Sequence, residues 1–266
     1  MDVYFVWSKG ADMRQLVFAS KWIGAQCIDF LLEQFPDDEY TFIVCEPEAD
    51  VVIEVLNRRK QPYMRFGVDS LNVVRGMDAG HYDWLLNLWG GYIFKHDTLS
   101  RVRNSLNIHP AYLPYCRGRD PIVWAIRYGF PAGVTLHTIN HEVDEGAIWY
   151  REEVPYKLPI RGIDLYDRVI ERCLGAFVER WAAIREGSIL PLTQSEYQQP
   201  QVCYTFKRRD LYVDQCIDVD QNLVAREVVL RLLAHDFEPS YSSKIIIEGK
   251  SYNAVISLVP SCDSKT

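Results

Sequence analysis

The sequence predicts an α/β fold in which helices cover both faces of a mostly parallel sheet. Short apolar runs typical of buried strands alternate with segments of helical periodicity over most of the chain. The 266 residues can bury a full core, and a composition of 48% hydrophobic and 24% charged residues is typical of a globular protein. In such folds ligands bind at the carboxyl ends of the strands, so polar residues just after a strand are the first candidates for function.

The alternation extends from the N-terminus to about residue 190. Buried strands are expected at residues 3–7, 40–45, 63–66, 84–89, 105–108, 133–138 and 148–154. Helices are expected at residues 20–34, 51–59, 97–103, 121–128 and 164–186. Pro121 can open its helix, because the N–H that proline lacks has no helical partner in a first turn. Gly187 can end the last helix, since glycine readily adopts the left-handed conformation that follows many helices.

The composition changes after Gly187. Prolines and glutamines between residues 191 and 202 indicate a polar linker. Residues 203–266 then predict a small α+β or β-hairpin domain, with a helix over 223–234 and a hairpin whose strands, 245–247 and 252–258, are joined by a turn at 248–250. We therefore expect a large domain over residues 1–190 and a small one over residues 203–266.

Charge and cysteine content narrow the class of protein. No apolar run approaches the roughly 18 residues of a membrane helix, and no basic segment typical of a signal peptide opens the chain. The seven cysteines are scattered without a Cys-x-x-Cys pair, which favours reduced thiols and a cytoplasmic protein. No spacing fits zinc, since His137 and His141 lack the intervening glutamate of a metalloprotease motif, so we expect no metal.

A candidate catalytic motif follows the strand expected at residues 105–108. Asn107 and His109 are two residues apart and therefore lie on the same side of that strand. An amide can stabilise a developing oxyanion while an imidazole transfers a proton, and the carboxylate of Asp144 can orient and charge the ring. Any one of these residues alone is more often structural. Pro110 and Gly118, however, indicate an extended loop of the kind that often carries function.

The same stretch resembles a known family in several ordered motifs. They read Asn107-Ile108-His109-Pro110-Ala111-Tyr112-Leu113-Pro114-Tyr115-Cys116-Arg117-Gly118, then Pro121, Trp124 and Ala125, then Gly133-Val134-Thr135-Leu136-His137, then Asp144-Glu145-Gly146. Together they resemble the folate-dependent formyltransferases, most of all the nucleotide-sugar N-formyltransferases. The resemblance covers about residues 80 to 190 and implies a Rossmann-like catalytic domain over residues 1–190 with a triad of Asn107, His109 and Asp144. The family's usual Asp-Glu-Gly-x-Asp-Thr-Gly loop differs here at Glu142 and Glu145.

The resemblance also implies the ligands. The formyl donor would be 10-formyltetrahydrofolate, bound by Trp89, Gly91, Tyr92, Ile93, Asn140, His141 and Glu142. The acceptor would be the amine of a nucleotide-linked amino-deoxy sugar used in surface polysaccharides. Its binding residues would be Tyr112, Tyr115, Arg117, Trp124, Lys207, Arg208 and Arg209. Core packing is an equal alternative for Trp124, as is a solvated surface for the basic cluster at 207–209.

In this reading His109 transfers the proton, Asn107 stabilises the oxyanion and Asp144 orients His109. Two alternatives stay open. Another formyltransferase, acting on methionyl-tRNA or a small amine, or a formyltetrahydrofolate hydrolase could use the same triad. A folate-binding or nucleotide-sugar-binding module would not use it for catalysis.

Residues 195–266 hold 8 Lys or Arg against 10 Asp or Glu, a net charge of −2 within a chain of −7. A nucleic-acid partner is therefore not expected. Nor is a membrane. A purine-pathway enzyme of this family would carry a glycine-rich phosphate loop after its first strand, whereas this sequence has Ser8-Lys9-Gly10 there. The family is often dimeric, so a homodimer is an expectation as well.

Overall fold

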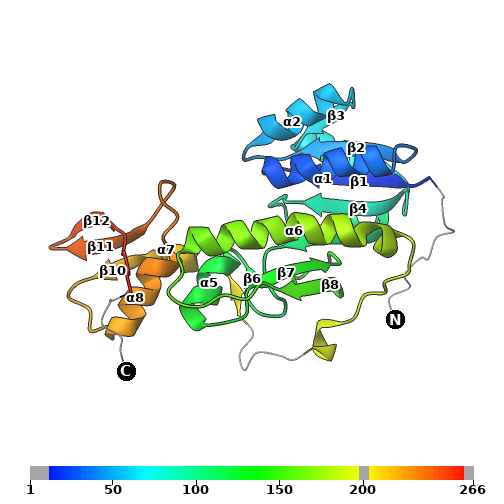
Figure 1. Cartoon of the computed structure of the whole chain (residues 1–266). Coiled ribbons are helices and arrows are strands. Elements are labelled where there is room, and N and C mark those ends of the chain that lie inside the picture. The colour runs from blue at the N-terminus through cyan, green and yellow to red at the C-terminus, as the bar shows by residue number, and fades with distance from the viewer. Residues whose placement is uncertain (1–11, 198–203, 261–266) are drawn as a thin grey trace.

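A computed structural model describes residues 12–197 and 204–260, and its largest element is a seven-stranded sheet (Figure 1). The strand order is β3-β2-β1-β4-β5-β7-β8. The strands are β1 (Arg14–Ala19), β2 (Glu39–Val44), β3 (Tyr63–Arg65), β4 (Tyr82–Leu88), β5 (Val102–His109), β7 (Gly133–His137) and β8 (Ile148–Glu153). The first five strands in this order run parallel, whereas β7 is antiparallel to both β5 and β8. The predicted fold class is confirmed.

Helices lie on both faces of this sheet. They are α1 (Lys21–Gln34), α2 (Ala49–Arg58), α3 (Val68–Arg75), α4 (His96–Leu99), α5 (Pro121–Tyr128) and α6 (Gly162–Arg185). Strand β1 shows why two layers are needed: Val17 and Ala19 join one buried cluster with α1, α2 and α6, while Leu16 and Phe18 join another with α3. Successive side chains of a strand point to opposite faces, so a strand that is apolar throughout must be covered twice.

The observed elements differ from the expected ones at several places. The strand expected at residues 3–7 lies outside the described residues, and β1 at Arg14–Ala19 was not expected. The helix expected at residues 97–103 is wrong in its second half, because α4 ends at Leu99 and Val102 already pairs with Tyr82 of β4. Sheet pairing there outweighs local helical propensity. Helix α3 was also missed.

The offset between β5 and β7 places the ends of these strands beside each other. They pair over three positions only: Asn107 with His137, Ile108 with Leu136, and His109 with Thr135. Strand β7 therefore ends beside Asn107, which in turn is the register partner of Asn87 on β4. Polar residues of β4, β5 and β7 thus form one row near the carboxyl ends of β4 and β5.

The C-terminal region adds smaller sheets. Its elements are β9 (Thr205–Phe206), α7 (Arg208–Gln215), β10 (Cys216–Asp218), α8 (Ala225–Ala234), β11 (Ser243–Ile247) and β12 (Lys250–Ala254). The expected helix and hairpin correspond to α8 and β11–β12, whereas α7 was not expected. The hairpin extends a sheet of order β10-β11-β12, while β9 pairs with the two-residue strand β6 (Arg117–Gly118). The boundary at residues 191–202 stays a prediction.

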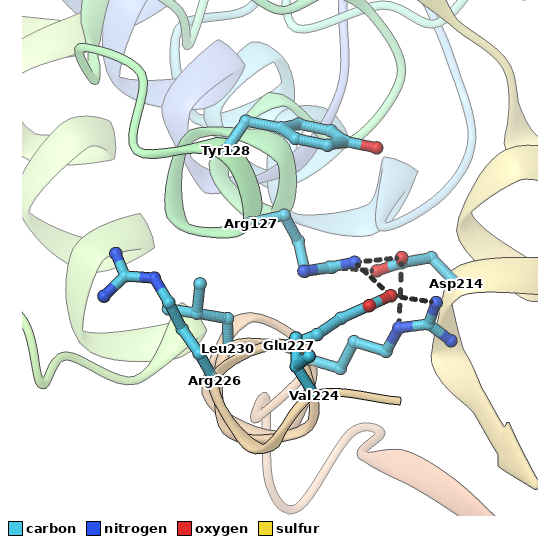
Figure 2. Close-up of a pocket in the computed structure, with 8 residues that line it drawn as sticks. Arg127, Tyr128, Asp214, Val224, Arg226, Glu227 and Leu230 are labelled. Atoms are coloured by element: carbon cyan, nitrogen blue, oxygen red, sulfur yellow. Dashed lines mark hydrogen bonds and ion pairs between the residues drawn. The ribbon is translucent and has the colours of Figure 1, made fainter. Parts of the chain in front are cut away.

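A buried ion-pair network joins this region to α5 (Figure 2). Arg127 donates from Nε and Nη2 to the two carboxylate oxygens of Asp214, at 2.6 and 2.8 Å. Asp214 also lies 2.9 Å from His235 Nε2. Burial alone would raise the pKa of Asp214, but His235 and Arg127 lower it to about 2. A cavity of about 440 Å³ opens beside this network.

Within the described ranges, no helix combines the length and apolar character needed to cross a bilayer.

Candidate active site

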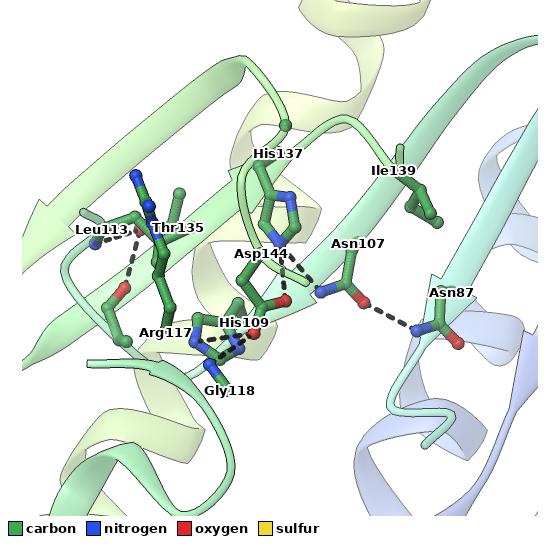
Figure 3. Close-up of polar contacts among 12 residues, drawn as sticks. Asn87, Asn107, His109, Leu113, Arg117, Gly118, Thr135, His137, Ile139 and Asp144 are labelled. Carbon is green, nitrogen blue, oxygen red and sulfur yellow. Dashed lines mark hydrogen bonds and ion pairs between the residues drawn. The ribbon is translucent and has the colours of Figure 1, made fainter. Parts of the chain in front are cut away.

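Asn107, His109 and Asp144 lie together at the end of β5 (Figure 3). Asn107 and His109 belong to the strand itself, and Asp144 comes from the loop between β7 and β8. Asp144 Oδ2 lies 3.6 Å from His109 Nε2 and accepts a 2.8 Å hydrogen bond from the backbone N–H of Gly118. The arrangement combines an amide, an imidazole and a carboxylate at one strand end.

The His109 ring favours its neutral form. Burial lowers its pKa, and this outweighs the charge of Asp144, which would raise it. Ring atom Nε2 faces two acceptors, the Asp144 carboxylate and, at 3.4 Å, the carbonyl of Cys116. We therefore assign the ring proton to Nε2. Nδ1 has no hydrogen-bond partner within the described ranges, so its lone pair can accept a proton.

Asp144 favours the ionised form. Burial would raise the pKa of its carboxyl group, but His109, His137 and the N–H of Gly118 lower it further than burial raises it. An ionised carboxylate next to a neutral imidazole stabilises the positive charge that the ring gains when it accepts a proton. This pair is suited to general base catalysis.

The loop that carries Asp144 is tied to a segment expected to be linker. Gln194 is buried and donates from Nε2 to the carbonyls of Asp144 and Gly146, at 2.7 and 2.9 Å. Its Oε1 accepts from Arg117, whose Nη1 also pairs with Glu145 at 2.9 Å. Glu145, one departure from the family loop, therefore serves as the partner of Arg117.

The other departure, Glu142, points to solvent, where its carboxylate lies 3.4 Å from His141. Gly146 is required by its surroundings, because a Cβ there would overlap the backbone carbonyl of Thr138. Sequence reasoning named the loop and its carboxylate. It missed Gln194, since a glutamine in a polar stretch carries no sign of burial.

Asn87 and His137 extend the site across the sheet and were not among the expected site residues. Asn87 Nδ2 donates to Asn107 Oδ1 at 2.7 Å, and Asn107 Nδ2 lies 2.9 Å from His137 Nε2. His137 Nε2 is also 3.5 Å from Asp144 Oδ1. The signal for Asn87 was available: an asparagine inside the apolar run 84–89 is unusual for a buried strand.

The residues expected to bind folate fall on two loops. Gly91 and Ile93 are exposed after β4, whereas the ring of Tyr92 packs against Phe18 and Phe94 in the cluster beneath α3. Trp89 directly follows β4 with a positive φ of 75°, packs against the cluster formed with α1, α2 and α6, and its carbonyl accepts a hydrogen bond from Ser20. The second loop holds Asn140, His141 and Glu142. Tyr92 and Ile139, the residue before the second loop, pack on the same cluster, which brings these parts of the two loops to one side of the sheet.

The residues expected to bind the acceptor are dispersed. Trp124 is 2% exposed and stacks on Phe206 with ring centroids 4.3 Å apart, so the core-packing alternative describes it. The guanidinium carbon of Arg151 lies 4.2 Å from the centroid of the Tyr112 ring. Tyr115 packs near Phe130. Arg117 contacts Gln194 and Glu145, as described above. Lys207, Arg208 and Arg209 are exposed at the start of α7.

Residues 89–179 match the family model described as formyl transferase. Curated relatives include a methionyl-tRNA formyltransferase of a Synechococcus species, 28% identical over 110 residues, or 41% of this chain and 34% of that protein. Another is a dTDP-4-amino-4,6-dideoxyglucose formyltransferase of Mycobacterium tuberculosis, 29% identical over 133 residues, or 49% of this chain and 56% of that protein. The chain thus spans between about a third and about half the length of these two relatives. The resemblance inferred from the motifs is confirmed.

Solved structures extend the similarity to nearly the whole chain. A 4-N formyltransferase from Francisella tularensis has a TM-score of 0.78 at 20% identity, covering 94% of this chain and 99% of that one, and so shares the fold. The formyltransferase PseJ from Anoxybacillus kamchatkensis has a TM-score of 0.55 at 25% identity, covering 75% and 88%. It was solved in complex with UDP-4,6-dideoxy-4-formamido-L-AltNAc and tetrahydrofolate.

Proposed function

We propose that this chain, whose residues 89–179 match the formyl transferase family model, transfers a formyl group from 10-formyltetrahydrofolate to the amine of a nucleotide-linked amino-deoxy sugar. One observation carries the proposal. Asn107, the neutral ring of His109 and the ionised Asp144 meet at the end of β5, inside the matched segment. Acyl transfer to an amine needs a base, a group that stabilises the resulting cation and an oxyanion donor.

In the first step the amine nitrogen attacks the formyl carbon, and the carbonyl electrons move to oxygen. Asn107 Nδ2 has two hydrogens, of which one is directed at His137 Nε2 and the other is available to the oxyanion. His109 accepts the amine proton at Nδ1, and Asp144 stabilises the resulting imidazolium. A single oxyanion donor of this kind contributes roughly 10²–10³ in kcat.

In the second step the oxyanion collapses and the bond between the formyl carbon and the folate nitrogen breaks. The imidazolium of His109 returns its proton to that leaving nitrogen. The products are the formamide and tetrahydrofolate, and the ring is neutral again for the next turnover.

Both ligands are supported by the similar proteins. The PseJ complex holds a formamido sugar nucleotide and tetrahydrofolate. We expect folate between the loops at 89–93 and 139–142. The exposed cations Lys207, Arg208 and Arg209 are suited to the pyrophosphate, since Arg117 already contacts Gln194 and Glu145. Surface polysaccharide synthesis, the cytoplasm and a homodimer remain our expectations for its setting.

The first experiment supplies 10-formyltetrahydrofolate with a panel of nucleotide-linked 3-amino and 4-amino deoxysugars and follows product mass. Gain of one formyl group supports the proposal and identifies the sugar. His109→Ala should lower kcat by about 10²–10⁴ while the protein stays folded and still binds folate. His96→Ala is a matched control, because His96 is exposed on α4. Wild-type turnover in His109→Ala would overturn the mechanism.

The same assay tests the alternatives. Release of formate without a formylated sugar would indicate a hydrolase. Formylation of methionyl-tRNA would indicate the activity named for the Synechococcus relative. The net charge of −2 over residues 195–266 argues against a tRNA substrate, because phosphate contacts depend on Lys and Arg.

A further inference from the structure

We propose that Asn87 is a positioning residue that fixes which side of the Asn107 amide faces the ligand. It does so through a row of hydrogen bonds with one direction, from Gly90 through Asn87 and Asn107 to His137. The three side chains are register partners on β4, β5 and β7. The catalytic consequence rests on the proposed function, whereas the direction of the row is a property of the free protein.

The backbone of Gly90 sets the direction at one end. Its N–H, which can only donate, lies 3.1 Å from Asn87 Oδ1, and its carbonyl, which can only accept, lies 2.9 Å from Asn87 Nδ2. A flipped Asn87 amide would place two donors and two acceptors against each other. The contact also requires glycine, since a Cβ at residue 90 would overlap Asn87 Oδ1.

The direction continues into the site. Asn87 Nδ2 donates to Asn107 Oδ1 at 2.7 Å, so the NH₂ group of Asn107 must point to His137 Nε2, 2.9 Å away. That nitrogen must then accept, which places the ring proton of His137 on Nδ1. There it donates to the carbonyl of Thr138 at 2.7 Å. Every contact of the row agrees with this single assignment.

The orientation of the Asn107 amide matters because the opposite orientation would also be compatible with hydrogen bonds to His137. If Asn107 flipped, its oxygen would face His137, and the ring could place a proton on Nε2, which lies 3.5 Å from Asp144 Oδ1. The flipped amide would present only an acceptor to the ligand and could not stabilise an oxyanion. Asn87 excludes that state, because the NH₂ groups of Asn87 and Asn107 would then meet. Both side chains are shielded, with Asn87 5% and His137 2% exposed.

Asn87→Asp tests the idea with almost no change in shape. The new carboxylate still accepts from the N–H of Gly90 but cannot donate to Asn107, so Asn107 should flip. We expect kcat to fall by roughly 10²–10³ with KM for both substrates nearly unchanged. In an Asn107→Ala background the same substitution should change kcat by less than about threefold, because residues that act through one group are not additive. If Asn87→Asp lowered kcat by the same factor in the Asn107→Ala background as in the wild-type protein, the proposal would be overturned. Asn72→Asp on the exposed side of α3 is the matched control and should leave kcat unchanged.

A second measurement needs neither ligand nor activity. Nitrogen-15 NMR of the histidine rings in the free wild-type protein should show His137 neutral with its proton on Nδ1. Asn87→Asp should add a proton at Nε2 and leave the ring doubly protonated, because Nδ1 still donates to the carbonyl of Thr138. A wild-type ring with its proton on Nε2 would overturn the row even if Asn87→Asp fails to fold. If no assay detects formyl transfer, the proposed function fails, but the position of the proton on the His137 ring still tests the row of hydrogen bonds.

Discussion

The chemistry of the site depends at the residue scale on the charge of two groups, His109 and Asp144. Burial keeps the ring of His109 neutral, while the hydrogen bond from the N–H of Gly118 favours the ionised form of Asp144. Neither state follows from residue type alone, since an unperturbed histidine has a pKa near 6.5. The site is therefore ready to accept a proton at neutral pH.

The pH profile should show this. Because burial lowers the pKa of His109, the neutral base persists below pH 6.5, and the acid limb of kcat/KM should lie below that value. Asp144→Asn removes the charge that raises the ring pKa, so the limb should move to still lower pH. The maximal rate should fall by about 10²–10⁴ because the imidazolium loses its counter-charge. Initial rates from pH 5 to 9 measure both effects, and a limb that moves to higher pH would contradict the assignment.

Single residues could be predicted where they belong to an ordered motif. Asn107, His109 and Asp144 were identified from spacing and resemblance, and the structure brings them together. Gln194 carries no such signal, and Asn87 stands out only as an asparagine in an apolar run, because the importance of both comes from register and burial. Asn87 matters since β4 pairs in a register that sets it beside Asn107, and that register is not written in the apolar pattern of residues 84–89.

At the scale of elements, strong periodicity was the best guide. The helices at α1, α2, α5 and α6 and most strands match their expected ranges within a few residues, since a buried face imposes its period on the sequence. Length does not separate the missed elements from the others, since α3 and α7, which were missed, each have 8 residues, as α5 does. Helix α7 was read as a basic cluster, although Asp210 accepts from the N–H of Lys207 and caps its first turn.

The pairing of β6 with β9 yields a prediction of its own. Gly118 has φ of 87°, and a Cβ there would overlap the backbone of Phe206 on β9. Gly118→Ala should therefore separate the two strands and withdraw the N–H that Asp144 accepts, which lowers both kcat and stability. Gly129→Ala is the matched control, with φ of 66° and open space around the Cβ, and should cost only about 1–2 kcal/mol.

Urea unfolding and initial rates compare the two variants. Equal losses of stability in both would show that the close approach of β9 contributes nothing beyond the strain of the left-handed backbone.

At the scale of the whole molecule, the ion pair between Arg127 and Asp214 connects α5 to the C-terminal region. Arg127→Met leaves the carboxylate of Asp214 buried with fewer partners, and the expected loss is about 3–5 kcal/mol in the free energy of unfolding. The double variant Arg127→Met, Asp214→Asn should recover part of that loss, because the amide carries no charge and its oxygen can still accept from His235 Nε2. Thermal unfolding followed by circular dichroism measures the series. A double variant less stable than Arg127→Met would contradict this account.

The row of Asn87, Asn107 and His137 has one more consequence, which concerns assembly of the chain. If β7 joined β5 one residue out of register so that Leu136 paired with Asn107, the buried amide donor of Asn107 would lose its acceptor. Such a loss costs about 1–3 kcal/mol, added to the penalty of turning an apolar strand face the wrong way. The polar groups to which we assign the proposed reaction thus also penalise misaligned folding intermediates, so substitutions of Asn107 or His137 should slow refolding as well.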